Sequence, residues 1–470
     1  MAEPASTSSA PGDSSVAGRS LLAQASDAWV SEAVAHLQAM LRMRTVNPPG
    51  NEAVVIDHVA GALRAAGLEP QVFEVAPGRS NLVCRIAGHG PEGPLLLASH
   101  ADVVEAEAES WRRDPFGGEI ADGCVWGRGA VDMKGKIAMD LAAMLAMARA
   151  GVRPRRDVVM LVVADEEAGC TLGSRWMVEN HPDLVRAEIC LNEVGGFTMH
   201  LLGVRYYPIQ VAEKGVCWLR LTFRGEPGHG SLPRPDSAPV RLASAVAKLG
   251  TTRLPVHLSP ESMRFVEALA AAQPGPVALA LRGLNQPLLS TTILDLGVRD
   301  PGQKGGLDAI LRNTVSPTVI RAGHKTNVIP GVATVELDGR TVPGQSSADL
   351  VREVRALVGD DFEVEMLEDL DPVTTSCDTP EYRLLCDVIR RHDPTGIPVP
   401  WLIPGFTDAK FYARLGTRCY GFMPLMLPEG MSFASMFHGH DERVPLDGYR
   451  WGLRVHLDAI ARLALDAEAR

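Results

Sequence analysis

The sequence holds little that would connect the protein to a membrane, to nucleic acid or to an oxidising compartment. It contains no uncharged apolar run of about 18 residues, so it has no candidate transmembrane helix. Lys and Arg total 46 against 57 Asp and Glu, and the net charge of −11 argues against a nucleic-acid or anionic-membrane partner. None of the eight cysteines stands in a C-x-x-C pair, which favours free thiols and a reducing, cytoplasmic location.

The first 25 residues are rich in Ala, Ser, Pro and Gly. They lack the basic start and apolar core of a secretory signal. We therefore expect residues 1–25 to be a disordered tail. The rest of the chain has ample length and apolar content for a large buried core.

Short, continuous apolar runs alternate with helical patterns after the tail. The runs predict strands that are buried on both faces, at 94–98, 157–164 and 187–191. Apolar residues at helical spacing predict helices at 27–45, 52–66 and 134–150. This alternation predicts an α/β fold, with helices on both faces of the sheet.

The pattern changes near residue 210. Residues 217–224 alternate between apolar and polar, as in a sheet with one solvated face. We also expect a helix at 236–250, a long helical stretch at 258–285, and strands at 315–322 and 332–340. We therefore expect a separate α+β domain at 211–344, inserted into an α/β domain that takes 26–210 and 345–470.

His100 and Asp102 directly follow the strand expected at 94–98. Residues two apart in an extended segment point to the same side. Asp102 is thus placed to hold one imidazole nitrogen of His100 while the other binds a metal. Taken alone, an H-x-D at a strand end is more often incidental.

A Gly-rich segment at 127–135 places Asp132 just before a predicted helix. Its three glycines suit a close approach of the backbone. A carboxylate offers two oxygens, so Asp132 could bridge two cations. An aspartate that caps the helix is the alternative.

Asp165, Glu166 and Glu167 follow the most apolar strand of the chain. Three adjacent carboxylates repel one another unless a cation or a proton is present. Their side chains diverge, so one can bind a metal while the next faces a water. A solvated acidic loop is less attractive here, because α/β folds place their sites at the carboxyl ends of strands.

Two further motifs complete the set. Glu193 follows the third apolar run, and His438 lies in a Phe-His-Gly-His-Asp-Glu segment near the C-terminus. Two histidines and three carboxylates provide nitrogen and oxygen ligands without thiolates, a set that Zn²⁺ accepts.

The order of these motifs resembles the M20 metallopeptidase family. H-x-D, G-R-G-A-x-D-M-K-G, D-E-E-x-G, N-E-x-G-G and H-G-x-D-E follow one another within residues 30–460. The family includes aminoacylases, acetylornithine deacetylase, succinyl-diaminopimelate desuccinylase, carboxypeptidases and carnosine-type dipeptidases. The surroundings of Trp111 and Trp126 look most like its carboxypeptidase S-like bacterial members. The resemblance implies a zinc-exopeptidase-like catalytic domain with a mixed sheet, and a lid and dimerisation domain at 211–344.

The resemblance also implies a ligand set for two zinc ions per chain, with Co²⁺ or Mn²⁺ as substitutes. His100, Asp132 and Glu193 would hold one ion. Asp132, Glu167 and His438 would hold the other, with Asp132 as the bridge.

Three more residues receive catalytic roles from the resemblance. Asp102 would orient His100, and Glu166 would take the proton of the attacking water and pass it to the leaving amine. His229 looks like the lid histidine that stabilises the oxyanion, often in the partner subunit's site. A homodimer through the lid domain is therefore expected.

Four residues look like contacts of a substrate carboxylate: Asn327, Arg340, Gly405 and Thr407. Arg suits this task because its fork pairs bidentately with a carboxylate. Arg340 stands thirteen residues after Asn327, so we expect both to face one anion. Phe406 departs from the family's G-G-T-D loop, in which a second Gly precedes the Thr.

The predicted reaction is hydrolysis of an amide bond next to a free carboxylate, with N-acyl amino acids as the first substrate class. A carboxypeptidase or dipeptidase would use the same ligands, so the sequence does not separate these activities. A non-catalytic metal-binding protein is the third reading, and Glu166 speaks against it because a metal site alone needs no base. The apolar segment 264–288 either shelters an acyl chain or forms lid core and dimer packing.

Overall fold

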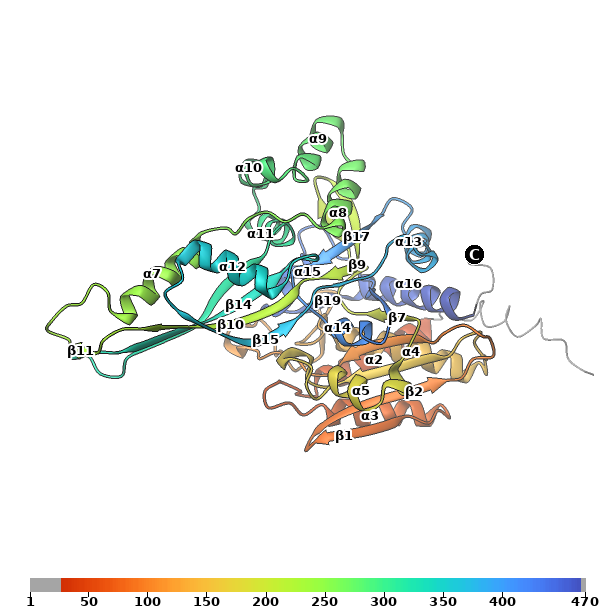
Figure 1. Cartoon of the computed structure of the whole chain (residues 1–470). Coiled ribbons are helices and arrows are strands. Elements are labelled where there is room, and N and C mark those ends of the chain that lie inside the picture. The colour runs from red at the N-terminus through yellow and green to blue at the C-terminus, as the bar shows by residue number, and fades with distance from the viewer. Residues whose placement is uncertain (1–26, 466–470) are drawn as a thin grey trace, which may run out of the picture. The chain divides into compact units, whose positions relative to one another are not determined.

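The computed structural model describes residues 27–465 and divides the chain into two compact units (Figure 1). Unit 1 holds the residues up to Ile209, together with Ser376–Val399 and those from Phe411 on. Unit 2 holds Gln210–Thr375 and Pro400–Lys410. The tail expected at 1–25 lies outside the described residues. Within 27–465, no helix is both long and apolar enough to cross a membrane.

Unit 1 is built on a mixed sheet with the strand order β1-β2-β6-β3-β7-β18-β9. Their bounds are β1 Gln71–Ala76, β2 Arg79–Ile86, β3 Leu95–His100, β6 Val158–Val163, β7 Ile189–Asn192, β9 Val204–Glu213 and β18 Arg418–Gly421. Strands β6, β3, β7 and β18 are parallel neighbours, whereas β1 and β2 are antiparallel. Every residue of β3 and β6 is buried, as their continuous apolar sequences predict.

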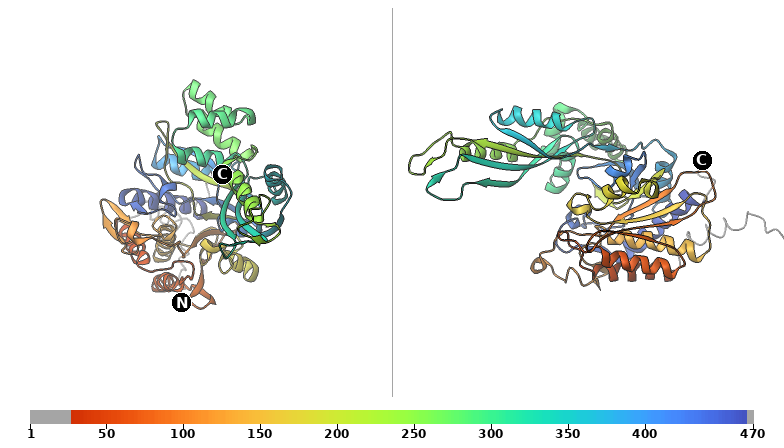
Figure 2. Two further views of the ribbon diagram at one scale, coloured as in Figure 1. Left: turned by 90° about the vertical axis from the view of Figure 1, so that its left-hand side faces the viewer. Right: turned by 60° about the horizontal axis from the view of Figure 1, so that its bottom comes forward.

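Helices pack on this sheet and on one another. Their bounds are α2 Asp27–Leu41, α3 Ala53–Ala65, α4 Lys134–Arg149, α5 Ser174–Asn180, α6 Pro182–Val185, α13 Pro380–His392, α14 Ala409–Ala413, α15 Phe433–Met436 and α16 Leu446–Ala464. Helix α3 lies on β1 and β2, and α4 lies on β3 and β6, with α2 and α16 against α4 (Figure 2). Helix α4 is buried on all sides from Lys134 to Met147, including the charged side chains of Lys134, Lys136 and Asp140.

Several short strands and two 3₁₀ helices accompany the main sheet. A three-stranded sheet has the order β19-β5-β4, with β4 at Glu119–Ala121, β5 at Cys124–Trp126 and β19 at Arg443–Pro445. Strand β8, Met199–Leu201, pairs with β9, and so does β17, Ile397–Ile403. Two short 3₁₀ helices are η1, Ala108–Ser110, and η2, Glu166–Ala168. The pairing of β19 with β5 brings the C-terminal motif beside the Gly-rich segment.

Unit 2 contains a four-stranded antiparallel sheet in the order β12-β14-β10-β15. The bounds are β10 Gly215–Arg224, β12 Thr314–Ala322, β14 Val332–Thr341 and β15 Glu363–Leu370. Alternate residues of β10 and β14 are buried under α7, Ala238–Thr251, and α12, Ser347–Val358. Strand β16, Val373–Thr374, pairs with the end of β9. Unit 2 thus continues past residue 344, where the sequence placed its end, because β15 completes the sheet.

The long helical stretch expected at 258–285 is divided between two helices, α8 Pro260–Ala271 and α9 Gly275–Gly283, and two more follow it, α10 Pro287–Gly297 and α11 Pro301–Ile310. Each has a proline in its first two positions. Proline suits a helix start but disrupts a helix interior, so the prolines favour several short helices over one long one.

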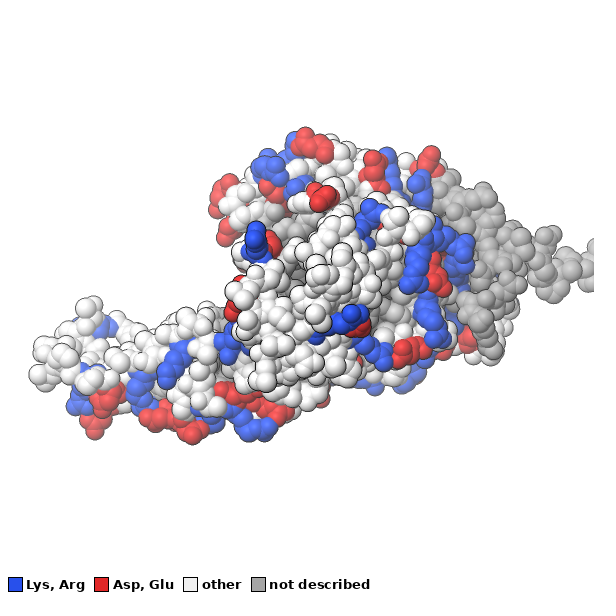
Figure 3. Space-filling model, turned by 90° about the horizontal axis from the view of Figure 1, so that it is seen from above, with Lys and Arg blue, Asp and Glu red and all other residues white. Residues whose placement is uncertain are grey.

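On the face drawn in Figure 3, acidic and basic groups lie next to one another in several places, around a central area without charged side chains.

Candidate active site

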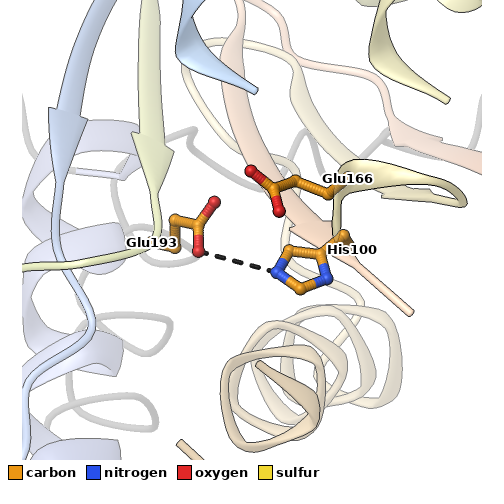
Figure 4. A group of neighbouring side chains, drawn as sticks. All are labelled: His100, Glu166 and Glu193. Carbon is orange, nitrogen blue, oxygen red and sulfur yellow. Dashed lines mark ion pairs between the residues drawn. The ribbon is translucent and has the colours of Figure 1, made fainter. Parts of the chain in front are cut away.

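Three neighbouring parallel strands deliver ligand-type side chains to one edge of the sheet. His100 is the last residue of β3, Glu166 and Glu167 follow β6, and Glu193 follows β7. Because β6, β3 and β7 are parallel, their carboxyl ends lie side by side. Figure 4 shows the side chains of His100, Glu166 and Glu193 turned toward one another.

The imidazole of His100 lies between two carboxylates. Its Nε2 atom is 3.0 Å from Oδ1 of Asp132 and 3.6 Å from Oε2 of Glu193. All three side chains are almost completely buried. Asp132 comes from the loop before α4, so a loop and two strands meet at this point.

A second histidine meets the other oxygen of the same aspartate. Nε2 of His438 is 3.1 Å from Oδ2 of Asp132 and 3.0 Å from Oε2 of Glu167. Asp132 therefore turns one carboxylate oxygen toward each histidine. The structure brings His100, Asp132, Glu167, Glu193 and His438 into one cluster. Two groups of side chains there could hold a metal ion: His100 with Glu166 and Glu193, and His100 with Asp132 and Glu167.

The donor atoms are spaced as ligands of a common cation are. Four ligands about 2.0–2.1 Å from a zinc ion form a tetrahedron with edges of about 3.3–3.4 Å. The four distances from the two histidines to their carboxylate partners span 3.0–3.6 Å. Imidazole nitrogens and carboxylate oxygens are also donors that zinc accepts. The residues therefore fit a bound divalent metal.

The shifted pKa values of the clustered side chains also indicate that the carboxylates there require positive charge nearby. Burial opposes the charged form of His438, but hydrogen bonds to Asp132 and Glu167 raise its pKa to about 10. His100 likewise has its pKa raised well above the usual value by the carboxylates around it, against the effect of burial. Burial and the Asp132 carboxylate raise the pKa of Glu167 to about 8. Protons thus neutralise a set of groups that a cation would neutralise instead.

Asp102 contacts both a histidine and the turn that carries Glu166. Its Oδ1 atom is 3.4 Å from Nδ1 of His100. Its two oxygens also accept the backbone N–H groups of Glu166, at 3.2 Å, and Glu167, at 3.1 Å. Nδ1 of His100 is also 3.1 Å from the backbone carbonyl of Asp102, so this residue lies against the imidazole and holds the start of η2.

Glu442 organises the Gly-rich loop, a role that the sequence analysis missed. Its carboxylate accepts a hydrogen bond from Nη1 of Arg128 at 2.7 Å. It also accepts the backbone N–H groups of Gly129, Val131 and Asp132, at 2.7–3.0 Å. The buried Arg128 in the Gly-Arg-Gly segment was the available signal, because a buried guanidinium requires a counter-ion.

Replacing Glu442 with Gln is expected to destabilise unit 1 strongly. The amide removes the charge that balances Arg128 and turns donor hydrogens toward backbone N–H groups. Breaking a buried pair in this way typically costs about 3–5 kcal/mol. Chemical denaturation of the variant checks the value. Asp441→Asn is the matched control: Asp441 pairs with the largely exposed Arg112, so a loss under about 1 kcal/mol is expected there.

His229 and Asn327 lie together at one end of unit 2. Strand β11, Gly228–His229, pairs with β13, Val328–Ile329. The N–H of Gly230 donates to the carbonyl of Asn327 at 2.8 Å. His229 is exposed, with Nδ1 2.8 Å from Oγ of Ser231. This pair lies beyond the ends of β10 and β14 (Figure 1).

Arg340 lies at the other end of the same sheet. It pairs with Val216 and Thr314, whereas Val332, at the start of β14, is the end nearest to Asn327. Eight residues of strand separate Val332 from Arg340, about 26 Å. The expectation that Asn327 and Arg340 face one anion is therefore wrong within one chain. The twelve residues between them run along an extended strand and a tight connection, not through a compact loop.

The guanidinium of Arg340 has one N–H donor atom without a hydrogen-bond partner among the described residues. Nε and Nη2 donate to the two oxygens of Asp338, at 2.6 and 3.0 Å, and the guanidinium lies over the ring of Phe406. Nη1 is buried and has no hydrogen-bond partner among the described residues. Gly405 and Thr407 flank that ring, and Oγ1 of Thr407 donates to Glu213 at 2.8 Å.

Comparisons with known proteins agree with these features. A model of the peptidase family M20/M25/M40 matches residues 96–462. The chain is 28% identical over 376 residues to probable carboxypeptidase S-like 2 of Dictyostelium discoideum, covering 76% of this chain and 69% of that protein. It is 29% identical over 388 residues to human N-fatty-acyl-amino acid synthase/hydrolase PM20D1, covering 80% of this chain and 75% of that one.

A solved structure shares the fold. The M20 family metallo-carboxypeptidase Sso-CP2 from Sulfolobus solfataricus superposes with a TM-score of 0.70 at 17% identity. The match covers 92% of this chain and 98% of that one. At this identity the likeness extends to the fold alone.

Proposed function

Because the chain belongs to the peptidase family M20/M25/M40, we propose that it is a two-zinc hydrolase that cuts an amide bond next to a free carboxylate. The observation that carries the proposal is the cluster at the ends of β6, β3 and β7, where Asp132 meets both His100 and His438. The first substrate class is that of N-acyl amino acids.

The cluster divides into two ligand sets that share one residue. His100, Asp132 and Glu193 would hold one ion, and Asp132, Glu167 and His438 the other. Bound there, two divalent ions polarise the scissile carbonyl and make the attacking water more acidic. Co²⁺ or Mn²⁺ would be accepted by the same nitrogen and oxygen donors.

Glu166 is proposed as the general base. It is buried beside His100 and Glu193, and η2 fixes its backbone next to the ligand Glu167. Its carboxylate takes the proton of the attacking water and gives it to the nitrogen of the leaving amine. Asp102 keeps the imidazole of His100 in orientation and holds the N–H of Glu166.

Arg340 is proposed to bind the substrate's carboxylate, with Gly405 and Thr407 nearby. Its unpartnered Nη1 supports this role, because a buried guanidinium N–H without an acceptor favours a ligand that brings one. The segment 264–288 covers parts of α8 to α10, and Leu279 and Leu288 are exposed there. Shelter of an acyl chain and dimer packing remain its two readings.

The substrate class rests on two further considerations. The human relative is named for hydrolysis of N-fatty-acyl amino acids, and we extend the acyl-amino-acid class to this chain. The carboxypeptidase S-like relative favours the alternative of a carboxypeptidase or dipeptidase, with the same ligands. A non-catalytic metal-binding protein would not require Glu166 beside its ligands.

A substrate panel separates these activities. Zinc-reconstituted protein is assayed with N-acyl amino acids of short and long acyl chain, and with dipeptides of the same C-terminal residue. The proposal predicts the highest kcat/KM for an N-acyl amino acid. A clear preference for dipeptides would replace the deacylase with a peptidase, and no turnover of any member would favour the metal-binding protein.

Arg340→Lys is expected to weaken turnover of acidic substrates. Lysine keeps the charge but loses the two-pronged geometry. Loss of one charge-assisted hydrogen bond, about 1.5–3 kcal/mol, corresponds to a fall in kcat/KM of about 10- to 150-fold. Arg220→Lys, which changes an ion pair with Glu336 on the same sheet, is the control and should retain activity. Equal activity of both variants would remove Arg340 from substrate binding.

We further propose a homodimer through unit 2, the lid and dimerisation domain. His229 and Asn327 lie too far along the sheet from Arg340 to contact one small substrate together with it in one chain. If Arg340 contacts the same substrate molecule as His229 and Asn327, then Arg340 comes from one subunit and the other two residues come from the second subunit. The cytoplasmic location also stays a proposal, supported by the eight free thiols.

Complementation between variants tests the shared site. Glu166→Ala and His229→Ala are each expected to be nearly inactive. Mixed, unfolded and refolded together, they form hybrid dimers in which one of the two sites holds both intact residues. Activity should therefore reappear in the mixture, read as kcat per mole of protein. A mixture no more active than its components would place His229 in its own chain's site or outside catalysis.

A further inference from the structure

A buried polar network lies behind the turn that carries Glu166. It links five side chains from separate parts of unit 1: Asn47, Glu52, Arg79, Asp102 and Asp165. Each has at most a tenth of its surface exposed. Of the five, only Asp102 has a specific role predicted from the sequence.

Arg79, at the start of β2, is held on three sides. Its Nε and Nη2 atoms donate to the two oxygens of Glu52 at 2.6 and 2.8 Å. Nη2 also donates to Oδ1 of Asp165 at 2.9 Å, and Nη1 donates to the carbonyl of Pro49 at 3.0 Å. The guanidinium thus bridges two buried carboxylates, and its planar fork allows both contacts at once.

Asp165 fixes the backbone just before Glu166. Its φ angle is 69°, in the left-handed region that non-glycine residues seldom adopt. Its carboxylate accepts hydrogen bonds from Arg79, from Nδ2 of Asn47 at 3.0 Å and from the N–H of Leu172 at 3.0 Å. These contacts hold a conformation that the backbone alone disfavours.

Asn47 joins this turn to the strand that ends at His100. Its Nδ2 atom donates to Oδ2 of Asp102 at 2.9 Å as well as to Asp165. The two hydrogens of one amide group thus serve two carboxylates. Asp102 in turn holds the N–H groups of Glu166 and Glu167. Asn47 itself is anchored by its backbone N–H to the carbonyl of Val103.

Asn81 supports the same turn from the same face of β2. It stands two residues after Arg79, so both side chains leave one side of the strand. Its Oδ1 accepts the N–H of Ala164 at 2.9 Å, and its Nδ2 donates to the carbonyl of Leu172 at 2.8 Å. Side chains from β2 therefore hold both ends of the segment Ala164–Leu172.

We infer that Arg79 and Asn47 are positioning residues that hold the general base Glu166 at its working place. The inference rests on the proposed role of Glu166. Neither residue is a member of the metal-ligand cluster. Arg79 acts through Asp165, the residue before Glu166, and Asn47 acts through both Asp165 and Asp102. Because Arg79 makes no hydrogen bond to Asp102, the residue that contacts the proposed ligand His100, its replacement should affect proton transfer rather than metal or substrate binding.

Arg79→Lys is the first test, with Arg85→Lys as the matched control. Arg85 lies on the same strand and pairs with Asp157 at 2.6 Å, away from the turn. A lysine at 79 keeps the charge but cannot bridge Glu52 and Asp165 together. Misplacement of a catalytic group by about 1 Å can cost about 10²-fold, so kcat should fall by about that factor. KM, zinc content and folding should be unchanged, and Arg85→Lys should match the wild type.

A double variant separates positioning from a general structural role. If Arg79 acts through Glu166, then Arg79→Lys adds no further loss of kcat to Glu166→Ala. Asn47→Ala, measured in the same cycle, should behave alike with a fall of about tenfold or more. It also serves as the test if Arg79→Lys does not fold.

The outcomes distinguish this inference from the function on which it rests. Near wild-type turnover of Glu166→Ala would overturn the proposed base and the inference with it. Loss of activity in Glu166→Ala beside full activity in Arg79→Lys and Asn47→Ala would overturn the inference alone. Additive losses, or loss of zinc from Arg79→Lys, would overturn it as well.

Discussion

Glu166→Ala is expected to bind two zinc ions and to lose about 10²–10⁴-fold in kcat, the usual contribution of general acid–base catalysis. Glu166 lies beside the proposed ligands and belongs to neither of the two proposed ligand sets. The methyl group cannot accept the proton of the attacking water or return it to the leaving amine. Steady-state kinetics on an N-acyl amino acid, with zinc counted in the same sample, measure both effects.

The neighbouring residue provides the matched comparison. Glu167 lies 3.0 Å from His438, so Glu167→Ala is expected to lose metal as well as activity. Two adjacent glutamates should thus give two different phenotypes, one catalytic and one in metal binding. Near wild-type kcat in Glu166→Ala, or metal loss in both variants, would contradict the role given to Glu166.

His438→Ala is expected to reduce the zinc content from two ions per chain to one and to abolish most turnover. The lost imidazole is the only nitrogen in the set of Asp132, Glu167 and His438. His100, Asp132 and Glu193 keep the other ion. Elemental analysis after zinc reconstitution and removal of free metal gives the stoichiometry.

His440→Ala is the control for that experiment. His440 stands two residues after His438, is exposed and contacts Glu107 at 3.2 Å. Its replacement should leave two ions and normal activity. A loss of both ions from His438→Ala would show that the two sets do not bind independently. Retention of two ions would remove His438 from the ligands.

The part of the site that the sequence predicted comes from strand ends and short motifs. His100, Glu167 and Glu193 follow apolar runs, and parallel strands bring their carboxyl ends together, so the runs alone predict convergence. Asp132 and His438 come from loops, and only the resemblance to a family placed them with the other three. The fold class followed from the same alternation of strands and helices.

Long-range polar contacts were not predictable in the same way. Glu442 meets Arg128 across 314 residues of sequence, and Arg79 meets Asp165 across 86. No local pattern encodes such pairs, because they depend on which loops the sheet order brings together. The prediction that Asn327 and Arg340 face one anion within one chain failed for the same reason, because the path of the chain between them was unknown. A separation of thirteen residues does not reveal whether the chain doubles back or runs straight.

One comparison tests the central claim that the protein hydrolyses an amide bond next to a free carboxylate. Wild-type protein reconstituted with zinc is given an N-acyl amino acid and the same compound with its carboxylate converted to a carboxamide. In its proposed role, Arg340 forms a charge-assisted hydrogen bond with the carboxylate, whereas a carboxamide offers a neutral oxygen and only a neutral-acceptor bond. We therefore expect the acid to be cleaved with a kcat/KM at least about tenfold higher. Equal cleavage of the acid and the carboxamide would contradict the claim, even if both zinc ions are bound.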